Sequence, residues 1–223
     1  MPTGDAPDRI PGGHPCTTRD ADAPGAATAF VHGSGITLRI LHAVSLLALC
    51  WYGMMLVHES GHMIATVLLG GRIEQVVLHP FAISQTVRSG SQSALADTWA
   101  GPLVGVLVPL ALWWAACRRC ARAVSDCRLF AGFCLLANGV YLGAGWIDGI
   151  GDAGDILAEG GALWTLLLFG TVSVGAGLAL IDGTHHELGF GRGARPVSTR
   201  RALLVIAVLL MVTGIGLVGG LRT

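Results

Sequence analysis

Two histidines and a glutamate in one apolar segment have the types and spacing needed for metal-dependent hydrolysis. They form the pentad His58-Glu59-Ser60-Gly61-His62. On a helix, residues four apart lie on one face, so both imidazoles can offer a nitrogen to one metal ion. Zinc lowers the pKa of a bound water to about 7, and a glutamate beside the first ligand can act as general base. The pentad therefore predicts a Zn²⁺ site with His58 and His62 as ligands and Glu59 as the catalytic base.

Two histidines and a water leave one position for a third protein ligand. Asp148, Asp152 and Asp155 follow an apolar run in a glycine-rich stretch whose backbone can be irregular. Irregular backbone at membrane depth is tolerated where it lines a water-filled cavity, which a hydrolase needs. The alternative is a solvated acidic turn at the membrane surface. We expect one of the three aspartates to bind the metal, and we expect Asp97 and Asp182, at the edges of apolar runs, to lie at the membrane interface.

The elements that must position these residues are membrane helices. Of the 223 residues, 52% are hydrophobic and 13% are charged, whereas soluble domains carry about 25% charged residues. The net charge is zero, so no basic surface for a nucleic-acid partner is implied. A helix crosses the bilayer in about 20 residues, and five apolar runs are long enough. These runs are 37–69, 97–117, 128–147, 161–182 and 202–220.

The fold class predicted from these runs is an all-α, multi-pass protein of the cell membrane with about five transmembrane helices. Residues 1–35 are rich in Pro, Gly, Ala and Asp and are expected to form a disordered tail, with the transmembrane domain spanning 36–223. The stretch from Arg72 to Arg88 is β-branched and partly alternating. It predicts a short strand or hairpin after the first helix, which must be enclosed by protein or lie at the interface.

Several motifs follow one another in a recognisable order. The pentad is followed by the strand-like segment Ile73–Val87, by Ala100-Gly-Pro-Leu-Val-Gly105 at the start of the next helix, and by Asn138 before the aspartates. Over roughly residues 45–160 the chain resembles the site-2 protease family of intramembrane zinc metallopeptidases, in a compact form. Three features depart from the family pattern. Tyr141 stands where the family has a proline, and Gly105 stands where it often has an asparagine. Ile147-Asp148-Gly149, which resembles the family's Leu-Asp-Gly, comes two residues late relative to Asn138.

The resemblance implies an endopeptidase that cuts a peptide bond in or near the transmembrane helix of a membrane-protein substrate within the bilayer. Zinc-activated water would attack, with Glu59 taking its proton and passing it to the leaving amine. The resemblance favours Asp152 as the third ligand, with Asp148 as the alternative. Asp155, three residues after Asp152, would then support the site from the same helix face.

Two other functions fit parts of the sequence. The first is a catalytically silent membrane protein of the same fold that binds or regulates partners, although the intact Glu59 favours an enzyme. The second is a membrane zinc peptidase of the prenyl-protein-processing type, which would take its third ligand from a downstream glutamate such as Glu159 or Glu187. The sequence indicates neither the substrate nor the oligomeric state.

The arginines predict an orientation that the resemblance contradicts. If all five runs span the membrane, eleven of the fourteen arginines lie on the side that holds the N-terminal part and the breaks 118–128 and 183–201. The positive-inside rule places that side in the cytoplasm. In the family, the helix with the pentad enters from outside, so that the active site lies near the cytoplasm. The side to which the site opens therefore stays undecided at the level of sequence.

Overall fold

The computed structural model describes residues 26–77, 84–120, 123–186, 188–191, 194 and 197–220. Within these residues, the chain forms helices and one two-stranded sheet. The elements are α1 (Ala26–Leu68), β1 (Arg72–Val77), β2 (Gln85–Ser89), α2 (Ala94–Arg119), α3 (Val124–Gly145), α4 (Gly151–Ala158), α5 (Leu163–Ile181), the 3₁₀ helix η1 (Thr184–His186) and α6 (Thr199–Gly220). Five of the helices, namely α1, α2, α3, α5 and α6, are long and apolar enough to cross a membrane. The predicted fold class is confirmed, and the chain is a multi-pass membrane protein.

Helix α1 begins earlier than we predicted. It starts at Ala26, so residues 26–35 are helical although we assigned them to the tail, and residues 1–25 lie outside the described part. The alanines at the start of α1 are strong helix formers, which explains the extension. Its apolar portion of 34 residues is about 51 Å long at 1.5 Å per residue, against a hydrocarbon layer of about 30 Å. The helix ends at Leu68, after which Gly70 has a φ of +74°.

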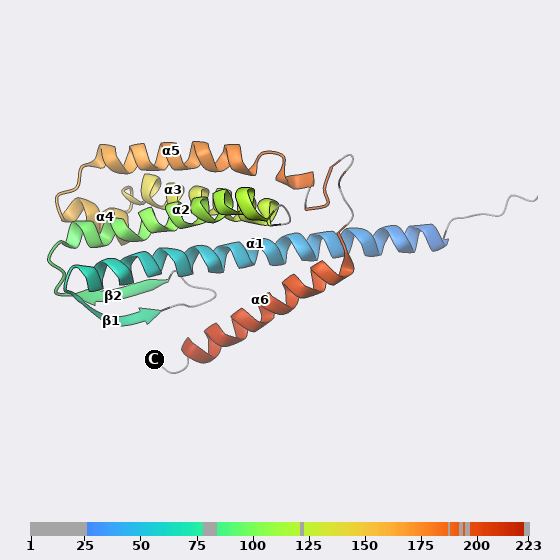
Figure 1. Cartoon of the computed structure of the whole chain (residues 1–223), viewed down its shortest axis with the longest axis horizontal. Coiled ribbons are helices and arrows are strands. Elements are labelled where there is room, and N and C mark those ends of the chain that lie inside the picture. The colour runs from blue at the N-terminus through green and yellow to red at the C-terminus, as the bar shows by residue number, and fades with distance from the viewer. Residues whose placement is uncertain are drawn as a thin grey trace, which may run out of the picture.

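The helices form a bundle in which α2 packs against α1 and α3, and α3 packs against α5 (Figure 1). Helix α6 packs against α1 and leans away from the other helices (Figure 1). A hydrogen bond between the Tyr52 and Thr213 hydroxyls, 3.3 Å apart, joins α1 to α6. Groups presented by α1, α2 and α3 can therefore meet inside the bundle.

The predicted β element is a hairpin. Strands β1 and β2 pair antiparallel, with an irregularity between Ile73 and Gln75. Both strands contact α1, and they lie at the same end of the bundle as α4 (Figure 1). A two-stranded hairpin is marginally stable by itself, so its position depends on the groups that it contacts on the helices.

The opposite end of the bundle holds the α2–α3 and α5–α6 connections (Figure 1). Arginines at this end join α1 to the α5–α6 connection and join α3 to α5 and α6. Arg39 Nη1 donates to the Gly189 carbonyl at 3.1 Å, and Arg128 Nε donates to the Leu180 carbonyl at 2.7 Å. Arg201 forms an ion pair with Asp126. The molecule thus has an arginine-rich end and an end that carries the hairpin and α4.

Candidate metal centre

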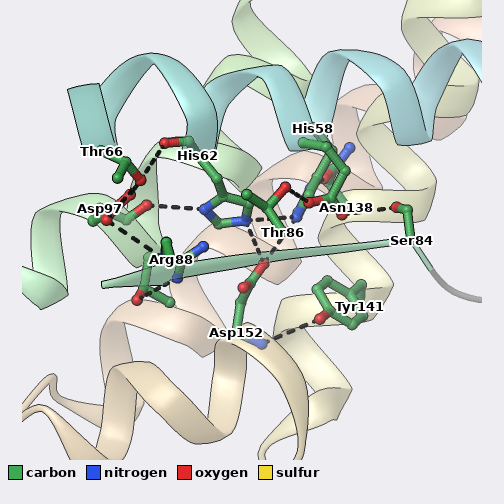
Figure 2. Close-up of polar contacts among 12 residues, drawn as sticks. His58, His62, Thr66, Ser84, Thr86, Arg88, Asp97, Asn138, Tyr141 and Asp152 are labelled. Atoms are coloured by element: carbon green, nitrogen blue, oxygen red, sulfur yellow. Dashed lines mark hydrogen bonds and ion pairs between the residues drawn. The ribbon is translucent and has the colours of Figure 1, made fainter. Parts of the chain in front are cut away.

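Three side chains that are far apart in the sequence converge at the end of the bundle that carries α4. His58 and His62 come from α1, and Asp152 comes from the first turn of α4 (Figure 2). The Nε2 atoms of the two histidines are 3.2 Å apart, and Asp152 Oδ2 lies 2.9 Å from His58 Nε2 and 3.3 Å from His62 Nε2. All three residues are buried. Together they form a group whose ligand atoms are close enough to hold one metal ion.

The outer nitrogens of both histidines are hydrogen-bonded in a way that sets their tautomers. Asn138 Nδ2 donates to the Cys134 carbonyl at 2.9 Å, so Asn138 Oδ1 faces His58 Nδ1 at 2.7 Å and accepts its proton. His62 Nδ1 donates to the backbone carbonyl of Asp97 at 2.9 Å. In the neutral rings, both Nε2 lone pairs therefore point toward Asp152 (Figure 2).

This arrangement fits a zinc ion. Two imidazole lone pairs and a carboxylate repel one another at such distances unless a cation or a proton lies between them, and His₂Asp is a donor set that Zn²⁺ accepts. Burial acts to raise the pKa of Asp152, but when the two histidines beside it are protonated, their hydrogen bonds and positive charge hold that pKa below its usual range. The carboxyl group is therefore ionised at neutral pH, as a metal ligand must be.

Glu59 lies in the same cavity as the three converging residues. The cavity has a volume of about 1140 Å³ and is lined by α1, α2, α3, α4 and β2. The Glu59 carboxylate is buried, and each of its oxygens accepts a hydrogen bond from a hydroxyl. Ser84 Oγ donates to Oε1 at 2.7 Å, and Thr86 Oγ1 donates to Oε2 at 2.5 Å. The predicted base is thus held beside the predicted ligands by the hairpin.

The other acidic candidates lie outside the converging group. Asp148 is exposed, in the turn between α3 and α4. Asp155 lines the cavity but is exposed as well. Glu159, at the end of α4, accepts a hydrogen bond from Thr98 Oγ1 at 3.2 Å. Glu187 lies outside the described residues. The structure therefore brings Asp152 to the histidines, and it does not bring Asp148 or Glu159 to them.

The backbone between α3 and α4 turns sharply to present Asp152. Gly149 and Gly151 have φ values of +63° and +62°, which L side chains rarely adopt. We predicted irregular backbone here, and the short helix α4 that follows it carries both Asp152 and Asp155. Tyr141 Oη accepts a hydrogen bond from the Asp152 amide at 3.1 Å, and its ring meets His58 edge-on with centroids 5.8 Å apart. The tyrosine at the family's proline position thus anchors the start of α4.

The Ala-Gly-Pro segment of α2 provides a face on which the metal-site residues pack. A Cβ atom at Gly101 would collide with the His62 imidazole, and one at Gly105 would lie 2.9 Å from Asn138 Nδ2. These glycines are one helical turn apart, so they face the same way. Gly61 of α1 lies against the Ala100 carbonyl in the same contact. The glycine at position 105 therefore leaves room for the asparagine that orients His58.

Asp97, which we expected at the membrane interface, lies in the first turn of α2. Its side chain is 1% exposed and enclosed by protein. Its carboxylate accepts hydrogen bonds from Thr66 Oγ1 at 2.9 Å and lies 3.5 Å from Arg88 Nε (Figure 2). A buried carboxylate requires such partners. Thr66 lies one turn after His62 on the same helix face, and this polar residue was the feature of the sequence that could have indicated a buried partner such as Asp97.

Comparison with protein families gives one match. A family model described as Peptidase M50B-like matches residues 31–142, about half of the chain. The matched residues run from α1 to near the end of α3 and include the pentad, the hairpin, the Ala-Gly-Pro segment and Asn138. Asp152 and α4 lie beyond them. No curated protein and no solved structure matches the chain.

Proposed function

The chain belongs to the Peptidase M50B-like family, and on that basis we propose that it is a zinc-dependent intramembrane endopeptidase. Its substrate would be a membrane protein cut in or near a transmembrane helix. The observation that carries the proposal is the convergence of His58 Nε2, His62 Nε2 and Asp152 Oδ2, with Glu59 buried in the same cavity. The five apolar helices support its location in a membrane, which we propose is the cell membrane.

Different residues of this chain would bind the metal, transfer the proton and orient the ligands during hydrolysis. A zinc ion bound by His58, His62 and Asp152 would act as a Lewis acid and lower the pKa of a water to about 7. Glu59 would take the proton released during attack on the peptide carbonyl and pass it to the leaving nitrogen. Asn138 and the Asp97 carbonyl, through their hydrogen bonds to the outer ring nitrogens, would keep the two Nε2 atoms available to the metal.

The cavity is also suited to an apolar peptide. From the metal-binding end it continues between α1 and α3, where Trp51, Met54, Phe133 and Leu136 line it. Regular helix shields its backbone carbonyls, so a substrate helix must unwind before its peptide bond reaches His58 and Glu59. The mixture of apolar wall and polar end supports a segment that is partly a transmembrane helix and partly extended.

The first prediction tests the proposed function directly. Purified wild-type protein is expected to contain one zinc ion per chain, and a His58→Ala/His62→Ala variant none, because the two imidazoles supply two of three ligands. Membranes from cells expressing wild-type protein should contain new N-termini within or beside transmembrane helices that are missing with the variant. Sequencing of N-terminal peptides measures this. Zinc without new termini would support the catalytically silent alternative, and wild-type protein without zinc would contradict a metalloprotease.

We further propose that the site opens to the side of the membrane opposite the cytoplasm. In the structure, Arg39, Arg118, Arg128 and Arg201 belong to the end away from the hairpin. The end that carries the metal-site residues has only Arg72 and Arg88 among the described residues, together with several acidic side chains, and Arg88 is paired with Asp97. Short connections rich in arginine remain in the cytoplasm. The fold thus supports the orientation predicted from the arginine count rather than the one implied by the family resemblance.

The second prediction concerns this orientation and uses the chain's own cysteines. Cys117 and Cys120 are exposed at the arginine-rich end, whereas Gln92, exposed in the turn between β2 and α2, lies at the other end. In intact cells, a membrane-impermeant maleimide should label a Gln92→Cys variant that has its other accessible cysteines replaced by serine. A matched chain that keeps Cys117 and Cys120 should react only after the membrane is permeabilised. The reverse pattern would place the site in the cytoplasm.

A further inference from the structure

The inner face of the hairpin strand next to the site is polar. Ser84, immediately before β2, and Thr86 and Arg88 within it alternate with Gln85 and Val87. Ser84 and Thr86 are buried, whereas Gln85 is exposed. Alternate residues of a strand point to opposite faces, and the buried face is usually the apolar one. This strand therefore buries two hydroxyl groups and half-buries the Arg88 guanidinium, and these groups need partners on the helices.

The two hydroxyls share one partner, the carboxylate of Glu59. Ser84 Oγ and Thr86 Oγ1 each donate to a different oxygen, at 2.7 and 2.5 Å. Hydrogen bonds to an ionised carboxylate are short and about twice as strong as those between neutral groups. With both oxygens held, the carboxylate plane of Glu59 is set by the strand as well as by its own helix.

Arg88 extends the same contact to the other side of the site. Its Nη2 donates to Thr98 Oγ1 at 2.9 Å, and its Nε lies 3.5 Å from Asp97 Oδ2. The backbone carbonyl of Asp97 receives the His62 Nδ1 proton. Strand β2 thus contacts Glu59, the residue of the proposed proton transfer. Its Arg88 also lies beside Asp97, which orients one proposed ligand (Figure 2).

We propose that Ser84 and Thr86 are positioning residues for Glu59, so that the docked hairpin holds the base in the orientation needed for hydrolysis. The proposal rests on the proposed function of Glu59. It also implies that the order of the hairpin depends on its contact with Glu59, because a two-stranded hairpin needs docking contacts to stay ordered. Loss of the hydroxyls should therefore free both the strand and the carboxylate, with no change in the groups that hold zinc.

The third prediction tests the dependence of the hairpin on the hydroxyls and requires no substrate. In a Ser84→Ala/Thr86→Val variant, the backbone amides of β2 should exchange hydrogen at least about tenfold faster than in wild-type protein, because local opening becomes easier. Glu59→Ala, which removes the shared acceptor, should have the same effect. Thr86→Ser keeps the hydroxyl and should exchange as wild-type does, as should Gln85→Ala on the exposed face. Unchanged exchange in the double variant would overturn the proposal.

The same variants separate positioning from binding once a cut site has been found. With a peptide that spans that site, Ser84→Ala/Thr86→Val should lower kcat by roughly 10- to 100-fold, whereas Thr86→Ser, which keeps both hydroxyls, should not, because positioning depends on the hydroxyls. Zinc content should stay at the wild-type level. A loss confined to KM, or an equal loss of kcat in Thr86→Ser, would contradict positioning of the base. Wild-type protein without zinc or cleavage would instead contradict the proposed function.

Discussion

A Glu59→Gln variant is expected to lose cleavage while keeping its zinc. Glutamine has nearly the same size and retains one oxygen for the hydroxyls of Ser84 and Thr86, but its amide cannot take a proton at neutral pH. Removal of a general base lowers rates by typically 10²- to 10⁴-fold. Glu59 is not among the three converging ligand residues, so the metal content should not change. The measurement is the yield of new N-termini in membranes, together with zinc analysis of the purified variant.

A matched control for Glu59→Gln is available on the hairpin. Glu74 is an exposed glutamate of β1, so Glu74→Gln makes the same chemical change away from the buried carboxylate. This variant should cleave as wild-type does. If Glu59→Gln retained full cleavage, the base would have to be another residue. If it lost zinc as well, the effect on cleavage would no longer identify Glu59 as a base.

An Asp152→Ala variant is expected to lose zinc, whereas Asp148→Ala is expected to keep it. The Asp152 carboxylate lies within hydrogen-bonding distance of His58 Nε2, while Asp148 is exposed in the preceding turn. Loss of an outer-shell partner weakens metal binding by roughly 10- to 100-fold, and loss of a direct ligand should weaken it more. The hydrogen bond from the Asp152 amide to Tyr141 involves the backbone, so the start of α4 should keep its position.

This experiment compares zinc per chain after dialysis against a chelator. Asp155→Ala serves as a second control, because its carboxylate lines the cavity but is exposed. Retention of zinc by Asp152→Ala together with its loss in Asp148→Ala would establish the alternative ligand. Loss of zinc in every variant would show that the glycine-rich turn as a whole, and not one carboxylate, governs binding.

Those features of the protein that depend on local spacing could be predicted from the sequence. The five spans follow from runs of apolar residues, since the bilayer demands a set length of helix. The hairpin follows from β-branched alternation between two such runs. The juxtaposition of His58 and His62 follows from the helical period, and the structure has both imidazoles turned toward one point.

The tertiary structure decided which distant groups meet these histidines. The glycine-rich stretch contains three aspartates, and residue type alone does not distinguish them as ligands. The turn through Gly149 and Gly151 and the packing of α4 bring only the middle one, Asp152, to the imidazoles. Asp97 lies at the edge of an apolar run in the sequence, yet packing of α2 against α1 encloses it.

The membrane spans, the hairpin and the paired histidines could therefore be predicted before the fold was known, because each depends on residues close together along the chain. The hydroxyls that hold Glu59 became recognisable only in the folded chain. Ser84 and Thr86 look like ordinary polar residues of an exposed strand until the hairpin docks on α1, 25 and 27 residues away from the carboxylate that they contact. The third acidic group and the side of the bundle that the cavity occupies likewise depend on helix packing and on backbone torsions at glycine, which no local pattern specifies.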